Sequence, residues 1–235
     1  PGGGSEAELV GKYVSADQLY GQFDFPLYWP IRGAFATEDT ALSWLGEVAL
    51  GTHSYYGAGS IMSSFLGNHD VSRFISEAGG DIPGACLDGS IVVAWDCPPA
   101  QPTTGEPYER IKRAFTFLAA HSAIPLIYYG DEIGLAGAGD PDNRRMMPWD
   151  NLNAQQLALR ESVSQLMAAR KQSLALRRGT LAVPSAGDVH LAIARKSGDE
   201  HAFALFNRAS EPFTFSLPNA GDQPLQDAFT GETMT

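Results

Sequence analysis

Apolar residues fall into short continuous runs and into longer stretches with helical spacing. Residues 61–66 and 124–129 are mostly apolar runs of strand length, and residues 23–25 form a shorter one inside an aromatic stretch. Three stretches have apolar residues three and four positions apart and predict helices: 41–50, 108–121 and 154–172. Strands that are apolar on both faces are covered by helices in parallel sheets. The order therefore predicts an α/β fold with three parallel strands.

The pattern changes near residues 178–180. Three short β-type runs follow, at residues 189–194, 202–206 and 213–217. Turn-forming residues at 196–200 separate the first two runs and are typical of a hairpin. The sequence therefore predicts a first unit over residues 1–178 and an antiparallel β domain over residues 179–235.

The strand predicted at residues 61–66 leads into three adjacent polar side chains: Asn68, His69 and Asp70. In parallel sheets, catalytic and binding residues gather just past the carboxyl ends of the strands. Asn and Asp are also ordinary turn residues, so capping and turn formation is the alternative interpretation. The spacing alone does not separate the two.

The composition allows a substantial core and narrows the class of partner. The chain has 235 residues, 44% of them hydrophobic, with 16 basic against 27 acidic residues and a net charge of −11. A phosphate backbone would be repelled, so we expect no nucleic-acid partner. No apolar stretch approaches the roughly 20 residues that span a bilayer. No signal peptide is recognisable, but the chain opens at Pro1 without a Met, so this says little about export.

The two cysteines, Cys86 and Cys97, lie in a polar, Pro- and Gly-rich insertion at about residues 77–105. They could close a small disulfide loop, which would favour an extracellular or periplasmic location. A pair of free thiols in a cytoplasmic protein is the alternative. The insertion offers too few closely spaced ligands for a metal site. Residues 1–8 are expected to be flexible by composition.

Four segments carry a resemblance to a known family. Residues 65–70, Phe-Leu-Gly-Asn-His-Asp, resemble the fourth conserved region of the α-amylase superfamily of glycoside hydrolases. The others resemble the family's sixth-strand segment, its eighth-strand segment and the loop after it, and they are residues 21–27, 124–132 and 139–145. The resemblance covers nearly the whole chain. It implies the C-terminal part of a (β/α)₈ TIM barrel, strands six to eight, followed by the start of a small antiparallel β domain.

The resemblance implies a retaining hydrolase of α-glucans such as starch or malto-oligosaccharides. Such enzymes need two carboxyl groups roughly 5 Å apart, and in the family these follow the fourth and fifth strands, which would precede Pro1. The early acidic residues do not lie in segments resembling the family's acid/base motif: Glu6, Glu8, Asp17 and Asp24. The chain is therefore expected to be a segment of a longer enzyme and to be inactive alone.

By resemblance, Asp70 matches the family's third carboxylate, which stabilises the transition state by accepting hydrogen bonds from hydroxyls of the distorted sugar. His69 matches the imidazole that holds the same sugar. Asn68 is counted with the substrate-binding residues, where it is expected to orient the loop rather than to touch the sugar. Hydrogen bonds that strengthen as oxocarbenium character develops bind the transition state more tightly than the ground state.

Asp140 and Arg144 resemble the acid and arginine that grip a glucose further along the substrate in the neopullulanase and cyclomaltodextrinase branch. Paired donors and acceptors suit vicinal hydroxyls, and a plain surface ion pair is the alternative. Trp149, Trp29 and Tyr28 could stack on glucose faces, with buried packing as the alternative for each.

Other features stay open. Asp131 and Glu132 lie either on the floor of the cleft or at its rim. Bond preference, product size and hydrolysis against transfer depend on upstream loops. The family's usual calcium site also depends on upstream segments, and no cofactor is expected in this chain.

Three parallel strands cannot close a barrel and would leave unpaired edges. The remaining alternatives are a non-catalytic glucan-binding or interaction scaffold on the same fold, and an unrelated α/β protein.

Overall fold

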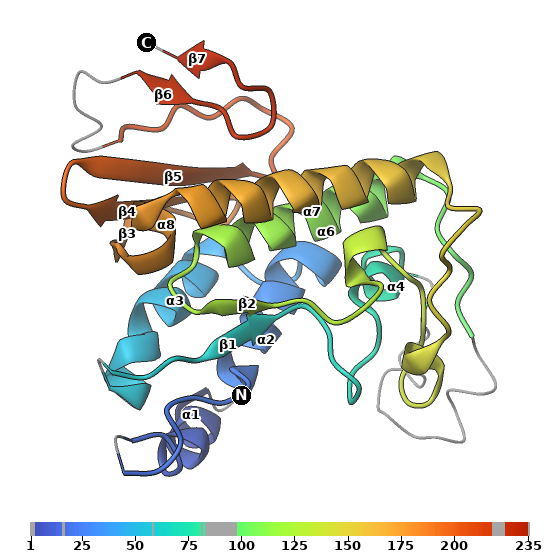
Figure 1. Ribbon diagram of the computed structural model, residues 1–235, viewed down its shortest axis with the longest axis horizontal. Coiled ribbons are helices and arrows are strands. Elements are labelled where there is room, and N and C mark those ends of the chain that lie inside the picture. The colour runs from blue at the N-terminus through green and yellow to red at the C-terminus, as the bar shows by residue number, and fades with distance from the viewer. Residues whose placement is uncertain are drawn as a thin grey trace.

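The computed structural model describes residues 3–15, 17–57, 59–80, 82, 98–217 and 224–234 of the chain. A short parallel sheet lies between helices, and a second, antiparallel sheet packs beside them (Figure 1). Within the described residues, no helix has the length and apolar character needed to cross a membrane.

The parallel sheet has the strand order that the sequence predicts. β1 (Ser63–Phe65) pairs with β2 (Ile124–Leu126), with Ser63 opposite Ile124. Phe23 adds an isolated parallel bridge to Ser63 on the other side. The strands are three residues long, shorter than the apolar runs that contain them. Among the described residues, no strand pairs with the far edge of β2.

The prediction of a strand over residues 23–25 is wrong beyond the single bridge. Helix α2 (Phe25–Arg32) begins there instead, because Asp24 accepts a hydrogen bond from the backbone N–H of Leu27 and Pro26 suits the first helical turn. The helix continues into a π-helical turn, η1 (Gly33–Thr37).

The remaining helices surround the sheet (Figure 1): α1 (Gly3–Gly11), α3 (Leu42–Tyr56), α4 (Phe74–Ala78), α6 (Gly105–Ala120), α7 (Ala154–Gln172) and α8 (Leu174–Arg178). Helix α7 has the predicted bounds, and α3 and α6 extend predicted helices. The prediction that residues 1–8 are flexible is wrong for α1. Its Ala7 is buried in a small cluster with Val14 and Met62. The helix begins with glycines and has few apolar residues, so its sequence does not predict a buried face.

The antiparallel domain is a three-stranded sheet with two small flanking strands. β3 (Thr180–Ala186), β4 (His190–Ser197) and β5 (Glu200–Asn207) form it in that order. The hairpin between β4 and β5 turns at Gly198, whose φ of 59° suits a residue without a side chain. Residues 213–217 form no strand, although their alternation predicts one. β6 (Leu225–Gln226) pairs with β7 (Thr233–Met234).

One continuous core joins α3, α6 and α7 to the antiparallel sheet. It includes buried apolar side chains from α3, α6, α7, β4 and β5, among them Leu45, Phe115, Leu166, Ile193 and Phe206. Two buried arginines reinforce the junction. Arg195 of β4 and Arg170 of α7 donate to backbone carbonyls at the end of α6, on Ala120 and on Ala119 and His121. Cations are favourable at a helix C-terminus, so the backbone carbonyls at the end of α6 can hold both guanidinium groups without a carboxylate.

Candidate active site

The loop after β1 places a buried amide beneath two exposed polar side chains. Asn68 is 2% exposed, and its Oδ1 accepts a hydrogen bond from the backbone N–H of Asp70 at 2.7 Å. Asn68 Nδ2 is buried without a hydrogen-bond partner among the described residues. The side-chain bond fixes the backbone at Asp70, and the loop leaves the sheet on the same side as the loop after β2 (Figure 1).

His69 and Asp70 present an imidazole and a carboxylate side by side. Their side chains are 56% and 59% exposed, and Nε2 of His69 lies 3.4 Å from Oδ1 of Asp70. A polyol that lies against this pair meets hydrogen-bond acceptors on the carboxylate and, from the ring, a donor or an acceptor.

The loop that carries Asp140 and Arg144 adjoins this pair. It includes the short helix η4 (Asp142–Arg144). Arg144 Nε lies 3.0 Å from Asp140 Oδ1, and Arg144 Nη2 donates to the backbone carbonyl of His69 at 3.0 Å. Two adjoining loops therefore carry four of the residues that the sequence proposes for sugar contact: His69, Asp70, Asp140 and Arg144.

A buried arginine that the sequence reading missed lies under both loops. Arg73 is 1% exposed; its Nε donates to the carbonyl of Asn143 at 2.8 Å, and its Nη1 donates to the carbonyl of Tyr129 at 2.6 Å and to Asp131 Oδ1 at 3.0 Å. The only signal for this role in the sequence is a cation three positions after Asp70. The local sequence does not show that its hydrogen-bond partners lie more than 50 positions away.

Asp131 begins the short helix η3 (Asp131–Ile133) and belongs to the interior. It is 2% exposed, and burial raises its pKa to about 6, although the Arg73 guanidinium acts in the opposite direction. Its Oδ2 has no hydrogen-bond partner among the described residues, which explains why burial dominates. Asp131 therefore supports the loops from within.

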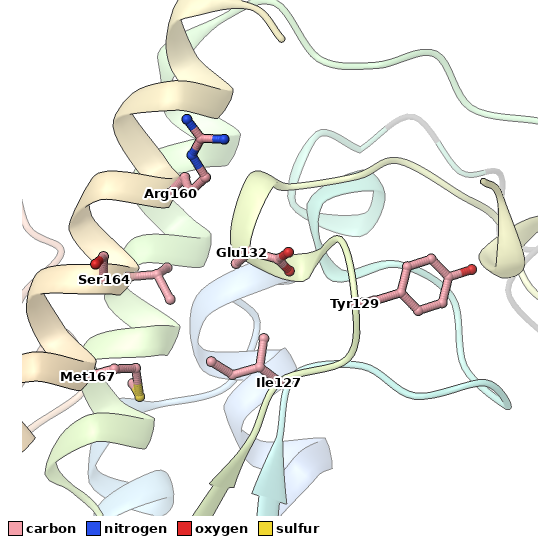
Figure 2. A pocket seen from close by; sticks show the side chains of 7 residues that line it. Ile127, Tyr129, Glu132, Arg160, Ser164 and Met167 are labelled. Carbon is pink, nitrogen blue, oxygen red and sulfur yellow. The ribbon is translucent and has the colours of Figure 1, made fainter. Parts of the chain in front are cut away.

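Glu132 faces a separate cavity. The cavity has a volume of about 420 Å³ and lies between the segment after β2 and α7. Figure 2 shows its lining side chains and labels Ile127, Tyr129, Glu132, Arg160, Ser164 and Met167; Val163 also lines the cavity. The lining is largely apolar and includes neither His69 nor Asp70, so this cavity is distinct from the surface formed by the two loops.

The three aromatic candidates differ in exposure. Tyr28 is 2% exposed and stacks on Phe65 with ring centroids 5.1 Å apart, so it is a core residue. Trp29 is 46% exposed and Trp149 is 85% exposed. Trp149 follows the Asp140–Arg144 loop and has a free face for a ligand.

The remaining predicted sites are not represented. Cys86 and Cys97 lie outside the described residues, so the structure does not test their disulfide. Within the residues that are described, no group of three or more His, Cys, Asp and Glu side chains is placed to hold a metal ion.

Comparison with known proteins identifies the family. No family model matches the chain. A cyclomaltodextrinase from Geobacillus thermopakistaniensis is 33% identical over 220 residues, which are 90% of this chain and 33% of that protein. An α-amylase structure from Anoxybacillus superimposes with a TM-score of 0.76 at 25% identity, over 97% of this chain and 45% of that one. The chain belongs to the α-amylase superfamily of glycoside hydrolases.

Membership confirms the fold that the sequence predicts, the C-terminal part of a (β/α)₈ barrel followed by an antiparallel β domain. A third similar protein is the α-amylase from Geobacillus thermoleovorans in complex with acarbose, with a TM-score of 0.65 and 27% identity over 84% of this chain and 38% of that one. The chain thus spans between a third and a half of the length of these proteins.

Proposed function

We propose that this chain is the part of a retaining α-glucan hydrolase that supplies the transition-state-stabilising carboxylate and contacts to the substrate. The observation that carries the proposal is the exposed pair of His69 and Asp70 on a loop whose backbone Asn68 fixes. The family to which the chain belongs supports this assignment, since its named members act on starch-type glucans.

Asp70 has the chemistry for this role. Its carboxylate accepts hydrogen bonds from two hydroxyls of a glucose ring, and these bonds strengthen as the ring flattens and its hydroxyls become more acidic. His69 holds the same glucose through its ring nitrogen. The nucleophile and the general acid/base that retaining hydrolysis also needs lie, in this proposal, on residues outside this chain.

Asp140 and Arg144 extend the surface to the next glucose units. The ion pair offers a carboxylate acceptor and guanidinium donors to vicinal hydroxyls, and the bond from Arg144 to the carbonyl of His69 keeps it beside the first loop. The 85% exposed Trp149 offers an apolar face on which a glucose ring can stack. An α-glucan of several units therefore fits these loops better than a single sugar.

The experiment is a comparison of variants in the natural polypeptide that carries this chain, assayed on maltohexaose and on a cyclomaltodextrin. Asp70→Asn removes the charge and keeps the shape, and we expect kcat/KM to fall about 10²–10³-fold, as for loss of one preorganised transition-state contact. Asp199→Asn, at an exposed position in the β4–β5 turn, is the matched control and should retain full activity.

Two results would count against the proposal. Activity of Asp70→Asn within about threefold of the parent would remove Asp70 from the reaction. Glucan binding without any turnover by the parent polypeptide, unchanged in Asp70→Asn, would favour the non-catalytic scaffold instead.

A further inference from the structure

Arg73 contacts the segments that carry both halves of the proposed sugar surface. It lies three residues after Asp70, and its side chain reaches the carbonyl of Asn143, inside the loop of Asp140 and Arg144, at 2.8 Å. Its Nη1 also holds the segment after β2, through the carbonyl of Tyr129 at 2.6 Å. One side chain thus connects the loop after β1 with two segments that lie 56 and 70 positions further along the chain.

The environment of Arg73 makes these bonds strong. The side chain is 1% exposed, and its guanidinium carbon lies 4.2 Å from the ring centroid of Tyr128 and 4.7 Å from that of Tyr129. Hydrogen bonds from a charged donor in such a low-dielectric setting are stronger than neutral ones, and aromatic faces stabilise the cation. Removing the guanidinium would leave buried carbonyls and Asp131 without a donor.

Further bonds make the connection specific to the two loops. The side-chain amide of Asn143 donates to the carbonyl of Val71 at 2.8 Å, and the backbone N–H of Arg73 donates to the carbonyl of Gly137 at 3.1 Å. Asp131 also lies against the start of the first loop, since a Cβ on Gly67 would be 2.7 Å from Asp131 Oδ2. The loops therefore have little freedom to move separately while Arg73 is in place.

We propose that Arg73 is a positioning residue that holds the loop of His69 and Asp70 in register with the loop of Asp140 and Arg144, so that one α-glucan chain contacts both. This inference rests on the proposed function. Arg73 itself is buried and does not touch the glucan. It sets the distance between successive sugar contacts and thereby the preference for longer substrates.

The test uses Arg73→Met and Arg73→Lys with a matched control elsewhere. Arg195→Met is the control because Arg195 is also 1% exposed and also donates to backbone carbonyls, those of Ala120 and Gly179, but lies in the antiparallel sheet. Both methionine variants should lose thermal stability. Arg73→Lys keeps the charge and tests the role if Arg73→Met does not fold.

The first readout is amide hydrogen exchange without any glucan. We expect exchange in residues 68–72 and 138–145 to accelerate at least about tenfold in Arg73→Met, less in Arg73→Lys and not in Arg195→Met, because local opening becomes easier where the link is lost. Unchanged exchange in both loops would overturn the inference whether or not the polypeptide is an enzyme.

The second readout is the ratio of kcat/KM for maltohexaose to that for maltotriose in the natural polypeptide. We expect this ratio to fall about fivefold or more in Arg73→Met, mainly through KM, and to stay constant in Arg195→Met. A constant ratio in Arg73→Met together with faster exchange would reduce Arg73 to a structural residue and overturn the positioning role. Absence of turnover in the parent would instead contradict the proposed function.

Discussion

Two buried carboxyl groups, those of Asp24 and Asp131, have raised pKa values and make the stability of the fold depend on pH. Asp24, at the start of α2, is 1% exposed and accepts hydrogen bonds from the N–H of Leu27 and the hydroxyl of Tyr56, both at 3.2 Å. Burial raises its pKa to about 6, as it does for Asp131. In both, burial outweighs the hydrogen bonds and charges that favour the ionised form.

The contribution of these two carboxyl groups to the stability of the chain should therefore fall as the pH rises from about 4 to above 6. Within this range these groups bind more protons in the folded state than in the unfolded state, in which the pKa of an Asp side chain lies near its ordinary value of 3.8. The rise in the Asp24 pKa from 3.8 to about 6 corresponds to about 3 kcal/mol. Asp24→Asn keeps the helix cap and should remove about this amount of pH dependence, measured by urea unfolding at pH 4 and pH 7.5.

Asp199→Asn is the control for this measurement, since it removes an equal charge from an exposed turn and should follow the parent curve. Stability that is equally pH-dependent in Asp24→Asn would exclude Asp24 as its source.

At the scale of residues, the sequence points to the side chains that emerge from the sheet and misses those that support them. Asn68, His69 and Asp70 are adjacent and follow an apolar run, so local pattern is enough to select them. Arg73 and Asn143 are 70 positions apart, and their contact depends on how two loops fold over the same sheet end. Periodicity carries no information about such a contact.

At the scale of elements, predictions succeed for long helices with regular apolar spacing. They fail where a capping residue decides between a helix and a strand. Helix α7 has many apolar positions at regular spacing, and its predicted bounds match the observed ones. The aromatic run at residues 23–25 has strand propensity, but Asp24 caps a helix there. Three-residue strands and five-residue helices such as β1 and α4 depend on tertiary packing, which local pattern does not report.

The start of α7 provides a test of capping. Asn153 and Gln156 form a reciprocal capping box, in which Asn153 Oδ1 accepts from the N–H of Gln156 at 2.9 Å. Asn153→Ala should lower the free energy of unfolding by about 1 kcal/mol. Thr104, the residue before α6, makes no side-chain capping bond, so Thr104→Ala should cost clearly less. Equal losses in the two variants, measured by urea unfolding, would contradict this account.

At the scale of the whole molecule, the open edge of the parallel sheet is its most unusual surface. Ile124 of β2 is 53% exposed, and the nearby Ile61 and Ile127 are 54% and 38% exposed. Backbone groups on that edge of β2 have no strand partner among the described residues. Exposed apolar strand edges promote association with other chains.

The chain on its own should therefore associate with itself in a concentration-dependent manner. Ile124→Lys places a charge on the edge and should weaken association by about tenfold, or roughly 1.4 kcal/mol, in sedimentation or light-scattering measurements. Leu157→Lys, which changes a 44% exposed apolar side chain on α7, is the control and should have little effect. Equal behaviour of the two variants would show that the edge has no special role.

The central claim is that the loops after β1 and β2 form one surface for an α-glucan. The most direct measurement is the change in amide hydrogen exchange on adding maltohexaose, mapped along the protein in its natural form. We predict protection in both the loop of His69 and Asp70 and the loop of Asp140 and Arg144, and loss of the first in Asp70→Asn. Protection confined to other regions, or no protection at saturating maltohexaose, would contradict the account.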